Sequence, residues 1–288
     1  MTDHISRVIL DCSSEDIIFV PNPGNAGDSF IAHCTYNFFD SIDLKYSIGQ
    51  ISKIYDDKVI ICGGGGSLVE PYRGMYEFIK RNKVRGNRII VLPQSIRAYP
   101  DMISMLDDAD HVYCREKKSF DYVNDHSAGC NVHLAHDMAF SWDPKTTLRK
   151  IGRESYFQIS DMELLLRNSK RIIRKWTHSL KNSDKSTLVC YRNDVERTSI
   201  KLPFDNFDMS QLFSADNLER EQSLWATWHM MSMISSFDTI CTNRLHVAIM
   251  ALLLKKKTVV SDNCYGKLKS VLDFSFQKRP DNLMFQDI

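Results

Sequence analysis

Short apolar runs that end in glycine, proline or polar residues recur along this chain of 288 residues. They lack the strict alternation of apolar and polar positions that is typical of a sheet with one face in water, which predicts strands covered on both faces in a parallel sheet. The runs are 17–24, 58–66, 88–95 and 111–116 in the first half, then 187–194, 238–244 and 257–263.

Segments of helical length separate the first runs, and this alternation of strands and helices predicts an α/β fold. These segments are 28–42, 72–84, 100–108 and 117–124. The stretch 145–183 is rich in Lys, Arg and Ser and lies between the two groups of strands. It predicts an N-terminal domain over 1–145 and a C-terminal domain over 146–288, with 145–183 as hinge and bridging helix. The polar stretch 197–222 predicts a surface loop with short helices.

Composition narrows the classes of function. The net charge is +1, so the chain lacks the strong basic character of a nucleic-acid binder, and an anionic ligand must be held locally. Eight cysteines without a CxxC pattern favour reduced, buried thiols. The first thirty residues lack a signal-peptide pattern, and the apolar run before the lysines at 255–257 is too short to span a bilayer. We expect a cytoplasmic protein, and peripheral association with the cytoplasmic membrane face stays an alternative.

The first run leads into "NPGNAGDSF" at 22–30, where Asn25 and Asp28 stand at the start of an apolar-periodic segment. A glycine-containing turn lets backbone N–H groups approach a ligand at a helix N-terminus. The alternative is a tight strand-to-helix turn capped by Asp28.

The second run ends in four consecutive glycines, including Gly64 and Gly65. Each glycine weakens regular structure by roughly 1 kcal/mol, so four in a row indicate backbone placed close against something, with simple flexibility as the alternative. The carboxyl ends of strands in an open parallel sheet are where ligands bind.

The next two runs also end in polar residues, with Gln94 and Ser95 in "LPQS" and Arg115 in "YCREKKS". Taken singly, each is explained by ordinary capping, whereas together they favour a binding edge. "HLAHDMAF" then contains His136 and Asp137, which suit an acid, a base or a hydrogen-bonding anchor, or a structural role. No partner motif supplies the further ligands that a zinc site needs, so we expect no metal.

The second half repeats the pattern. "LVCYRNDVER" places Arg192 after a buried strand, and "TICTNRLH" places Asn243 where it can cap a helix whose first turn holds Arg244 and His246. Arginine in a first turn opposes the helix dipole, so its natural partner is an anion bound at that N-terminus. Two arginines at two strand ends can hold a small dianion, and His246 can exchange a proton with it.

The ordered series "GNAGD", "GGGGSL", "PQS", "CREKKS", "HDMA", "YRNDVE", "RLH" and "SDNCYGK" resembles the polysaccharide pyruvyl transferase family over roughly residues 19–275. The resemblance implies two Rossmann-like domains facing across a cleft, similar to GT-B glycosyltransferases. It implies transfer of the enolpyruvyl carbons of phosphoenolpyruvate to two hydroxyls of a sugar, giving a pyruvate ketal and phosphate. Carried across, Arg192, Arg244 and His246 contact the donor, and Lys267 is the downstream lysine of the pattern.

The implied chemistry needs an acid, for which His246 is the candidate, and a base near the acceptor, for which Asp28 and His136 are candidates. It needs neither metal nor redox cofactor. A nucleotide-sugar glycosyltransferase and a non-catalytic binding protein of glycan assembly are the alternatives. The expected partners are phosphoenolpyruvate and the sugar of a polysaccharide or lipid-linked oligosaccharide precursor, and no nucleic acid.

Overall fold

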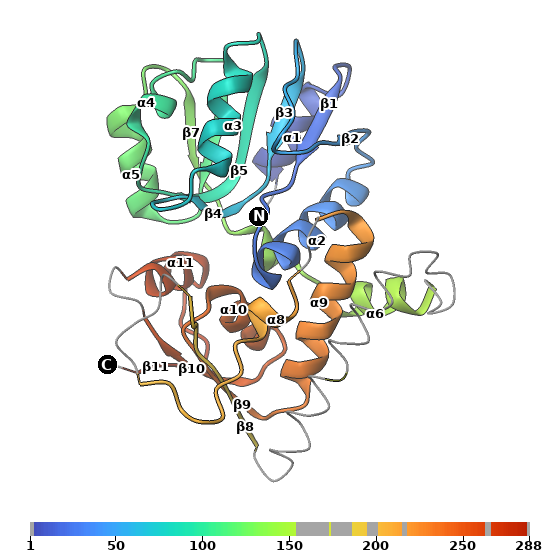
Figure 1. Cartoon of the computed structure of the whole chain (residues 1–288), viewed down its shortest axis with the longest axis vertical. Helices are drawn as coiled ribbons and strands as arrows, with labels where there is room; N and C mark the ends of the chain where they lie inside the picture. Colours follow the sequence, from blue (N-terminus) through green and yellow to red (C-terminus); the bar gives the residue numbers. More distant parts are fainter. Residues whose placement is uncertain are drawn as a thin grey trace. The chain divides into compact units, whose positions relative to one another are not determined.

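A computed structural model describes residues 3–153, 173, 186–194, 201–214, 218–262 and 266–286. Within this part of the chain every strand pair is parallel, and the strands form two sheets (Figure 1). The α/β fold with parallel sheets expected from the sequence is thus confirmed. The chain divides into two compact units, Met1–Asn22 with Cys34–Met138 and Pro23–His33 with Ala139–Ile288.

The first unit contains a sheet of order β2-β1-β3-β5-β6-β7, with β4 paired to β5. Its strands are β1 (Ile17–Val20), β2 (Ser47–Ile48), β3 (Val59–Cys62), β4 (Gly65–Leu68), β5 (Arg88–Ile96), β6 (His111–Cys114) and β7 (Asn131–Leu134). Since β1 lies between β2 and β3, successive strands are added in opposite directions from that point. The carboxyl ends of β1 and β3 therefore form the switch point at which open α/β sheets bind ligands.

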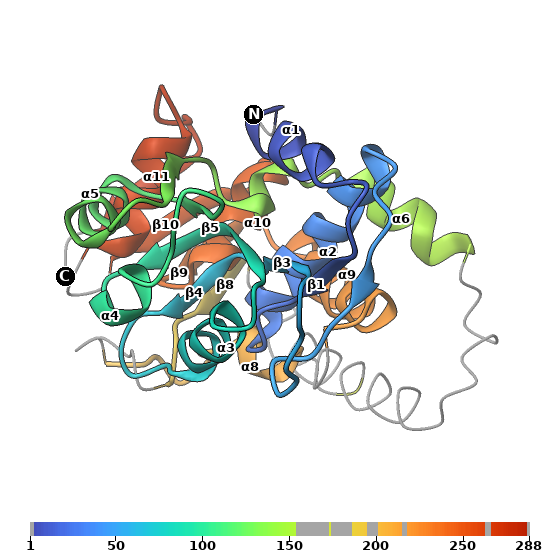
Figure 2. The ribbon, with the colours of Figure 1, turned by 90° about the horizontal axis from the view of Figure 1, so that it is seen from above.

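Helices cover both faces of this sheet. They are α1 (Asp3–Asp11), α2 (Ala26–Ser41), α3 (Gly74–Lys83), α4 (Pro100–Ile103) and α5 (Lys117–His126). Figure 2 shows α3 and α1 on opposite faces. The face under α3, α4 and α5 carries one apolar cluster, to which β1 contributes Val20. Because neighbouring strand residues point to opposite faces, Phe19 packs on the other side, with ring centroids 5.4 Å from Tyr36 and 5.1 Å from Phe39 of α2.

The second unit contains a sheet of order β11-β10-β9-β8. Its strands are β8 (Thr187–Cys190), β9 (Thr239–Thr242), β10 (Lys257–Ser261) and β11 (Leu283–Gln286). Its helices are η1 (Met138–Ser141, with Met138 in the first unit), α6 (Pro144–Arg153), α8 (Met209–Leu212), α9 (Arg220–Ser235), α10 (Leu245–Leu253) and α11 (Lys267–Ser275). Helix α10 is apolar almost throughout, as a fully buried helix must be, and it packs on β9, β10 and α9.

The first turns of α2 belong to the second unit, where side chains hold them in place. His33 Nε2 lies 3.0 Å from Thr147 Oγ1 of α6, and the same hydroxyl accepts a hydrogen bond from Trp142 Nε1 at 2.9 Å. The Trp142 ring meets Phe30 edge-on, with 5.2 Å between centroids. Residues 23–33 therefore group with the C-terminal sheet, an assignment that the sequence pattern did not suggest.

Several sequence predictions differ from the structure in extent. The helix expected over 100–108 is only the single turn of α4. The stretch 197–222 contains the short helix α8, as expected, but also the start of the long helix α9. Most of the bridging helix expected within 145–183 lies outside the described residues, which include α6. The seven described cysteines are all free, and six of them are buried, as expected of reduced thiols.

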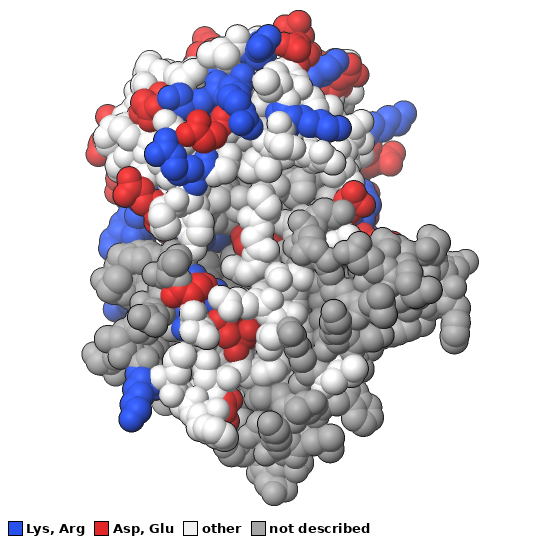
Figure 3. Space-filling view, viewed as in Figure 1, with Lys and Arg blue, Asp and Glu red and all other residues white. Residues whose placement is uncertain are grey.

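On the face of the first unit seen in Figure 3, Lys and Arg side chains lie among Asp and Glu side chains. Around α3, Arg73 pairs with Glu77 at 3.0 Å, and Lys80 pairs with Asp101 at 2.7 Å. This surface region therefore lacks the one-sign field that steers nucleic acids. Among the described residues, no helix is long and apolar enough to cross a membrane.

Candidate functional site

The carboxyl ends of β8 and β9 in the second unit are joined in register. Cys190 and Thr242 are paired across the two strands, and Thr242 Oγ1 donates a hydrogen bond to the Cys190 carbonyl at 2.7 Å. Just beyond the strands, the backbone N–H of Arg192, two residues after β8, donates to Oδ1 of Asn243, one residue after β9, at 2.7 Å. The two loops that carry the predicted arginines are therefore fixed beside each other.

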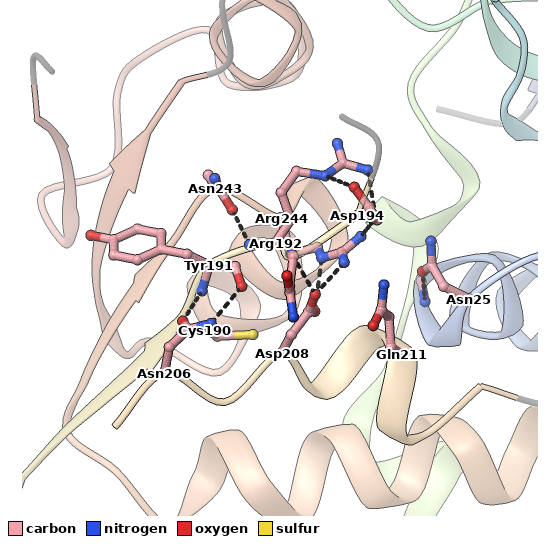
Figure 4. A network of polar contacts seen from close by, with 12 residues as sticks. Asn25, Cys190, Tyr191, Arg192, Asp194, Asn206, Asp208, Gln211, Asn243 and Arg244 are labelled. Carbon is pink, nitrogen blue, oxygen red and sulfur yellow. Dashed lines mark hydrogen bonds and ion pairs between the residues drawn. The ribbon is translucent and has the colours of Figure 1, made fainter. Parts of the chain in front are cut away.

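Arg192 and Arg244 are largely buried, with 8% and 5% of their surface exposed, and two carboxylates hold their guanidinium groups (Figure 4). Asp208 accepts hydrogen bonds from Nε of Arg244 at 2.9 Å and from Nη2 of the same residue. Asp194 accepts from Nε of Arg192 at 2.9 Å and lies 2.7 Å from Nη1 of Arg244. The structure thus brings together the two arginines that the sequence placed at separate strand ends.

The formal charges of these four side chains cancel. Paired carboxylates stabilise buried guanidinium groups, which would otherwise lose their hydration without compensation. Bidentate contacts also fix the plane of each guanidinium, because its N–H groups form a rigid fork. A dianion bound here would need further positive groups or the displacement of a carboxylate.

The start of α10 differs from the sequence prediction in one respect. Arg244 occupies the N-cap position, and Asn243 does not cap the helix, because its Oδ1 accepts the N–H of Arg192 instead. Thr242 Oγ1 accepts the N–H of Arg244 at 3.0 Å. His246 is the second residue of the helix, and it is half-buried.

The start of α2 is a reciprocal cap. Asn25 Oδ1 accepts the N–H of Gly27 at 2.7 Å, while Asp28 Oδ2 accepts the N–H of Asn25 at 2.8 Å. The N-cap residue is thus Asn25, not Asp28, and Asp28 supplies the return contact of a capping box. This arrangement uses both predicted site residues to build the turn.

Gly27 brings α2 close to the first turn of α10. A Cβ at Gly27 would lie 2.6 Å from Nδ1 and 3.1 Å from Cγ of His246. Only glycine leaves room for the imidazole at that distance. The structure therefore brings His246 beside the N-terminal turn that contains Asn25 and Asp28, although these residues are more than two hundred positions apart in sequence.

Lys267 begins α11 and is 8% exposed. Asp262, which follows β10, accepts the backbone N–H groups of Leu268 at 3.1 Å and Lys269 at 3.2 Å. The carboxylate therefore satisfies the positive end of this helix. Strand β10 is thus followed by an aspartate and a lysine, Asp262 and Lys267, just as charged residues follow β8 and β9.

The predicted binding residues of the first unit form a separate, buried network. Arg115 Nη1 donates to Asp137 Oδ2 at 2.6 Å, and its Nε donates to Ser95 Oγ at 2.9 Å. Gln94 Nε2 donates to the Gly63 carbonyl at 2.8 Å. The four side chains involved are at most 1% exposed, and these contacts connect the ends of β3, β5 and β6. These hydrogen bonds tie the ends of the three strands together.

Two of the four glycines have a conformational reason that involves no ligand. A Cβ at Gly63 would lie 2.6 Å from the backbone nitrogen of Asn22, so β1 and β3 can approach only with glycine there. Gly65 has a φ of 132°, a conformation that other residues rarely adopt. Gly64 is buried between them.

The segment "HLAHD" does not assemble a metal site. His133 Nε2 lies 3.1 Å from His111 Nδ1, and Asp137 pairs with Arg115. In the part of the chain that the structure describes, no group of three or more His, Cys, Asp or Glu residues is placed to hold a metal ion. Burial lowers the pKa of His136, which favours the neutral imidazole, a proton acceptor.

Sequence reasoning assigned no role in the site to three residues, Asp208, Asn22 and Asp194. Asp208 comes from the stretch expected to be a surface loop, and nothing in its neighbourhood indicated a contact with Arg244. Asn22 lies two residues after β1 at the switch point and is 5% exposed, and its Oδ1 accepts no hydrogen bond from the described residues. The sequence signal for Asn22 was its position two residues after a buried strand, and for Asp194 it was its position two residues after Arg192.

A carboxyl sheet edge that carries paired arginines beside helix N-termini is a setting in which α/β proteins bind anionic ligands. The chain belongs to the polysaccharide pyruvyl transferase family, whose profile matches residues 25–265. It is 25% identical over 278 residues to the Bacillus subtilis (strain 168) protein named "Putative pyruvyl transferase EpsO", covering 88% of this chain and 83% of that protein. It is also similar to the crystal structure of a functionally uncharacterized protein, KP1_0663, from Klebsiella pneumoniae subsp. pneumoniae NTUH-K2044. That match has a TM-score of 0.76 and 27% identity, and covers 99% of this chain and 98% of the other.

Proposed function

We propose that this protein transfers the enolpyruvyl group of phosphoenolpyruvate to two hydroxyls of a sugar in a glycan precursor, forming a cyclic pyruvate ketal and releasing phosphate. The observation that carries the proposal is the arginine pair at the carboxyl ends of β8 and β9, beside His246. Membership of the polysaccharide pyruvyl transferase family supports pyruvyl transfer to a glycan over a nucleotide-sugar reaction.

The donor is a small trianion with a phosphate and a carboxylate, and the second unit offers matching groups. Arg192 and Arg244 present planar forks suited to either group, and the N-termini of α2 and α10 add positive potential. Lys267, at the start of α11, is a further cation of the same unit. We assign these three basic residues to donor binding.

The reaction balances without a metal or redox step. A proton delivered to the methylene carbon of the donor makes C2 electrophilic, and a first sugar hydroxyl adds there and loses its proton. The C2–O bond to phosphate then breaks, and the second hydroxyl adds to C2 to close the ketal. One hydroxyl proton balances the proton placed on carbon, and the other leaves with phosphate.

His246 is the residue that we assign to proton delivery, since it lies in the first turn of α10 next to Arg244. The arginines stabilise the charge on the departing phosphate. Of the two candidate bases, Asp28 already accepts the N–H of Asn25 as a carboxylate, whereas His136 has a pKa lowered by burial. A carboxylate oxygen and a neutral imidazole can each accept a proton, so Asp28 and His136 both remain candidate bases.

We assign the acceptor sugar to the first unit. Asn22 supports this assignment, because a buried amide oxygen at a switch point is suited to accept a hydrogen bond from a sugar hydroxyl. The sheet edge that contacts the acceptor would then be supported by buried residues of the same unit: Gln94, Ser95, Arg115, Asp137, Gly64 and Gly65. The GT-B-like arrangement of the two units stays a prediction of the family resemblance, as does peripheral association with a membrane.

The test is to incubate the purified protein with phosphoenolpyruvate and a panel of labelled oligosaccharides. We expect phosphate release in step with a product whose mass rises by pyruvic acid less one water. A parallel incubation replaces phosphoenolpyruvate with nucleotide sugars, and release of a nucleoside diphosphate there would instead identify a glycosyltransferase. Glycan binding with neither reaction would indicate a non-catalytic binding protein.

A further inference from the structure

The carboxylate of Asp194 contacts both guanidinium groups of the arginine pair. Its Oδ1 accepts Nε of Arg192 at 2.9 Å, and its Oδ2 accepts Nη2 of Arg192 at 3.2 Å and lies 2.7 Å from Nη1 of Arg244. A phosphate or carboxylate of a ligand would use the same bidentate geometry. The Asp194 carboxylate therefore marks a position where an oxyanion of a ligand could contact both arginines.

Asp208 has a different set of contacts. It holds Nε and Nη2 of Arg244, and its Oδ2 also accepts the backbone N–H of Asn193 at 2.9 Å. Its side chain is 9% exposed, against 20% for Asp194. Asp208 thus ties Arg244 to the backbone, whereas Asp194 is the more accessible carboxylate and bridges both arginines.

We propose that Asp194 is a displaceable counterion of the donor site: its carboxylate occupies the place between Arg192 and Arg244 that an anionic group of the donor takes on binding. The inference rests on the proposed function, because it concerns the same arginine pair. In the absence of donor, Asp194 neutralises the buried guanidinium groups. Donor binding must break these contacts, so Asp194 lowers the apparent affinity and favours ligands with enough negative charge to replace it.

The proposal predicts opposite effects for the two aspartates. Asp194→Asn keeps the shape but removes the competing charge. Affinity for a small anion should therefore rise by at least about tenfold, because one unit charge a few ångströms away has roughly that effect even when water screens it fully. Asp208→Asn releases Arg244 from its fixed orientation and should weaken binding. A merely supporting Asp194 would instead weaken binding in the same direction as Asp208.

The experiment is calorimetric titration of the full chain with phosphoenolpyruvate and, separately, with inorganic phosphate at low ionic strength. The variants are Asp194→Asn, Asp194→Ala, Asp208→Asn and a control, Asp238→Asn. Asp238 is exposed and precedes β9, at the opposite edge of the same sheet. Far-UV circular dichroism and thermal unfolding without ligand check that each variant is folded.

We expect both Asp194 variants to bind more tightly than the parent, Asp208→Asn to bind more weakly, and Asp238→Asn to match the parent. Unchanged or weaker binding by both Asp194 variants overturns the inference. If the parent and the variants bind inorganic phosphate in this order of affinity but do not bind phosphoenolpyruvate, the counterion role holds and the proposed donor is wrong. If neither ligand binds the parent or any variant, both the counterion role and the proposed donor are wrong.

Discussion

At the scale of single residues, the chemistry proposed for this chain depends most on His246. A positioned acid or base contributes roughly 10²- to 10⁴-fold in rate. His246→Gln keeps a hydrogen-bonding side chain but cannot exchange a proton near neutral pH. We expect turnover to fall by about that range while donor affinity is retained, measured on one preparation. Turnover within a few-fold of the parent would make His246 structural and move the search for the acid to His136.

Gly27 gives an independent test of the position of His246. In Gly27→Ala the new methyl group would lie 2.6 Å from Nδ1 of His246, so the ring or the helix must move. Overpacking of this kind costs about 1–3 kcal/mol, and we expect turnover to fall as well. The matched control is Gly152→Ala in α6, where a Cβ would meet nothing within 4 Å.

The control substitution should leave turnover unchanged and stability equal or higher, since alanine is the better helix former by about 1 kcal/mol. Chemical unfolding curves and initial rates for both variants give the comparison. Equal turnover in the two variants would mean that the contact between Gly27 and His246 has no catalytic importance.

At the scale of elements, α1, β6 and β7 meet through a group of aromatic and histidine rings in the first unit. His111 and His133 stack with 5.4 Å between ring centroids, and His4 of α1 lies 4.3 Å from His133. His4 Nδ1 also lies 3.0 Å from the Tyr113 hydroxyl. Burial, and then the neighbouring His133, lowers the pKa of His111 from 6.5 to about 4. Burial, and then His4, lowers the pKa of His133 as well.

These lowered pKa values make stability depend on pH in a defined window. Below a pH of about 6.5 the unfolded chain binds protons that the folded chain excludes, so the free energy of unfolding should fall as the pH decreases from about 6.5 to 4. The melting temperature of His111→Gln should depend less on pH over this window. His126→Gln is the control, since His126 ends α5, where its Nδ1 lies 2.8 Å from the Tyr122 carbonyl of the same helix. Equal slopes for His111→Gln and the parent would contradict the assignment.

The elements also show which parts of the fold could be predicted from the sequence. Long apolar runs such as 88–95 gave the central strands, because burial on both faces leaves a continuous apolar signal. β7, with the sequence NVHL, was missed because it is a half-buried edge strand that combines polar and apolar residues. α9 was missed because its buried residues surround the helix, so it lacks a clear amphipathic period.

The candidate site was likewise only partly predictable from the sequence. The proximity of Arg192 and Arg244 could be predicted because parallel strands end at one edge, which brings together the residues that follow neighbouring strands. Asp208 could not, since its contact depends on the path of a loop. Nor could the surroundings of Gln94 and Arg115: they follow strands as Arg192 does, and only the structure shows that both are buried and bonded to neighbouring strand ends.

At the scale of the whole molecule, we propose that turnover needs no metal. The balanced reaction uses proton transfer and electrostatic stabilisation, and the cations assigned to the phosphate are arginines and a lysine. Exhaustive treatment with a chelator, followed by assay, should therefore leave the rate unchanged. A rate that is lost on chelation and restored by a single divalent ion would contradict this.

The central claim is that the arginine pair of the second unit binds phosphoenolpyruvate, and thermal unfolding with and without the donor tests it most directly. A ligand that binds only the native state raises the melting temperature. We expect a rise for the parent and for Arg149→Gln, whose guanidinium lies on the exposed side of α6. Arg192→Ala and Arg244→Ala should remain folded and lose the rise. If both still respond like the parent, the donor is bound elsewhere.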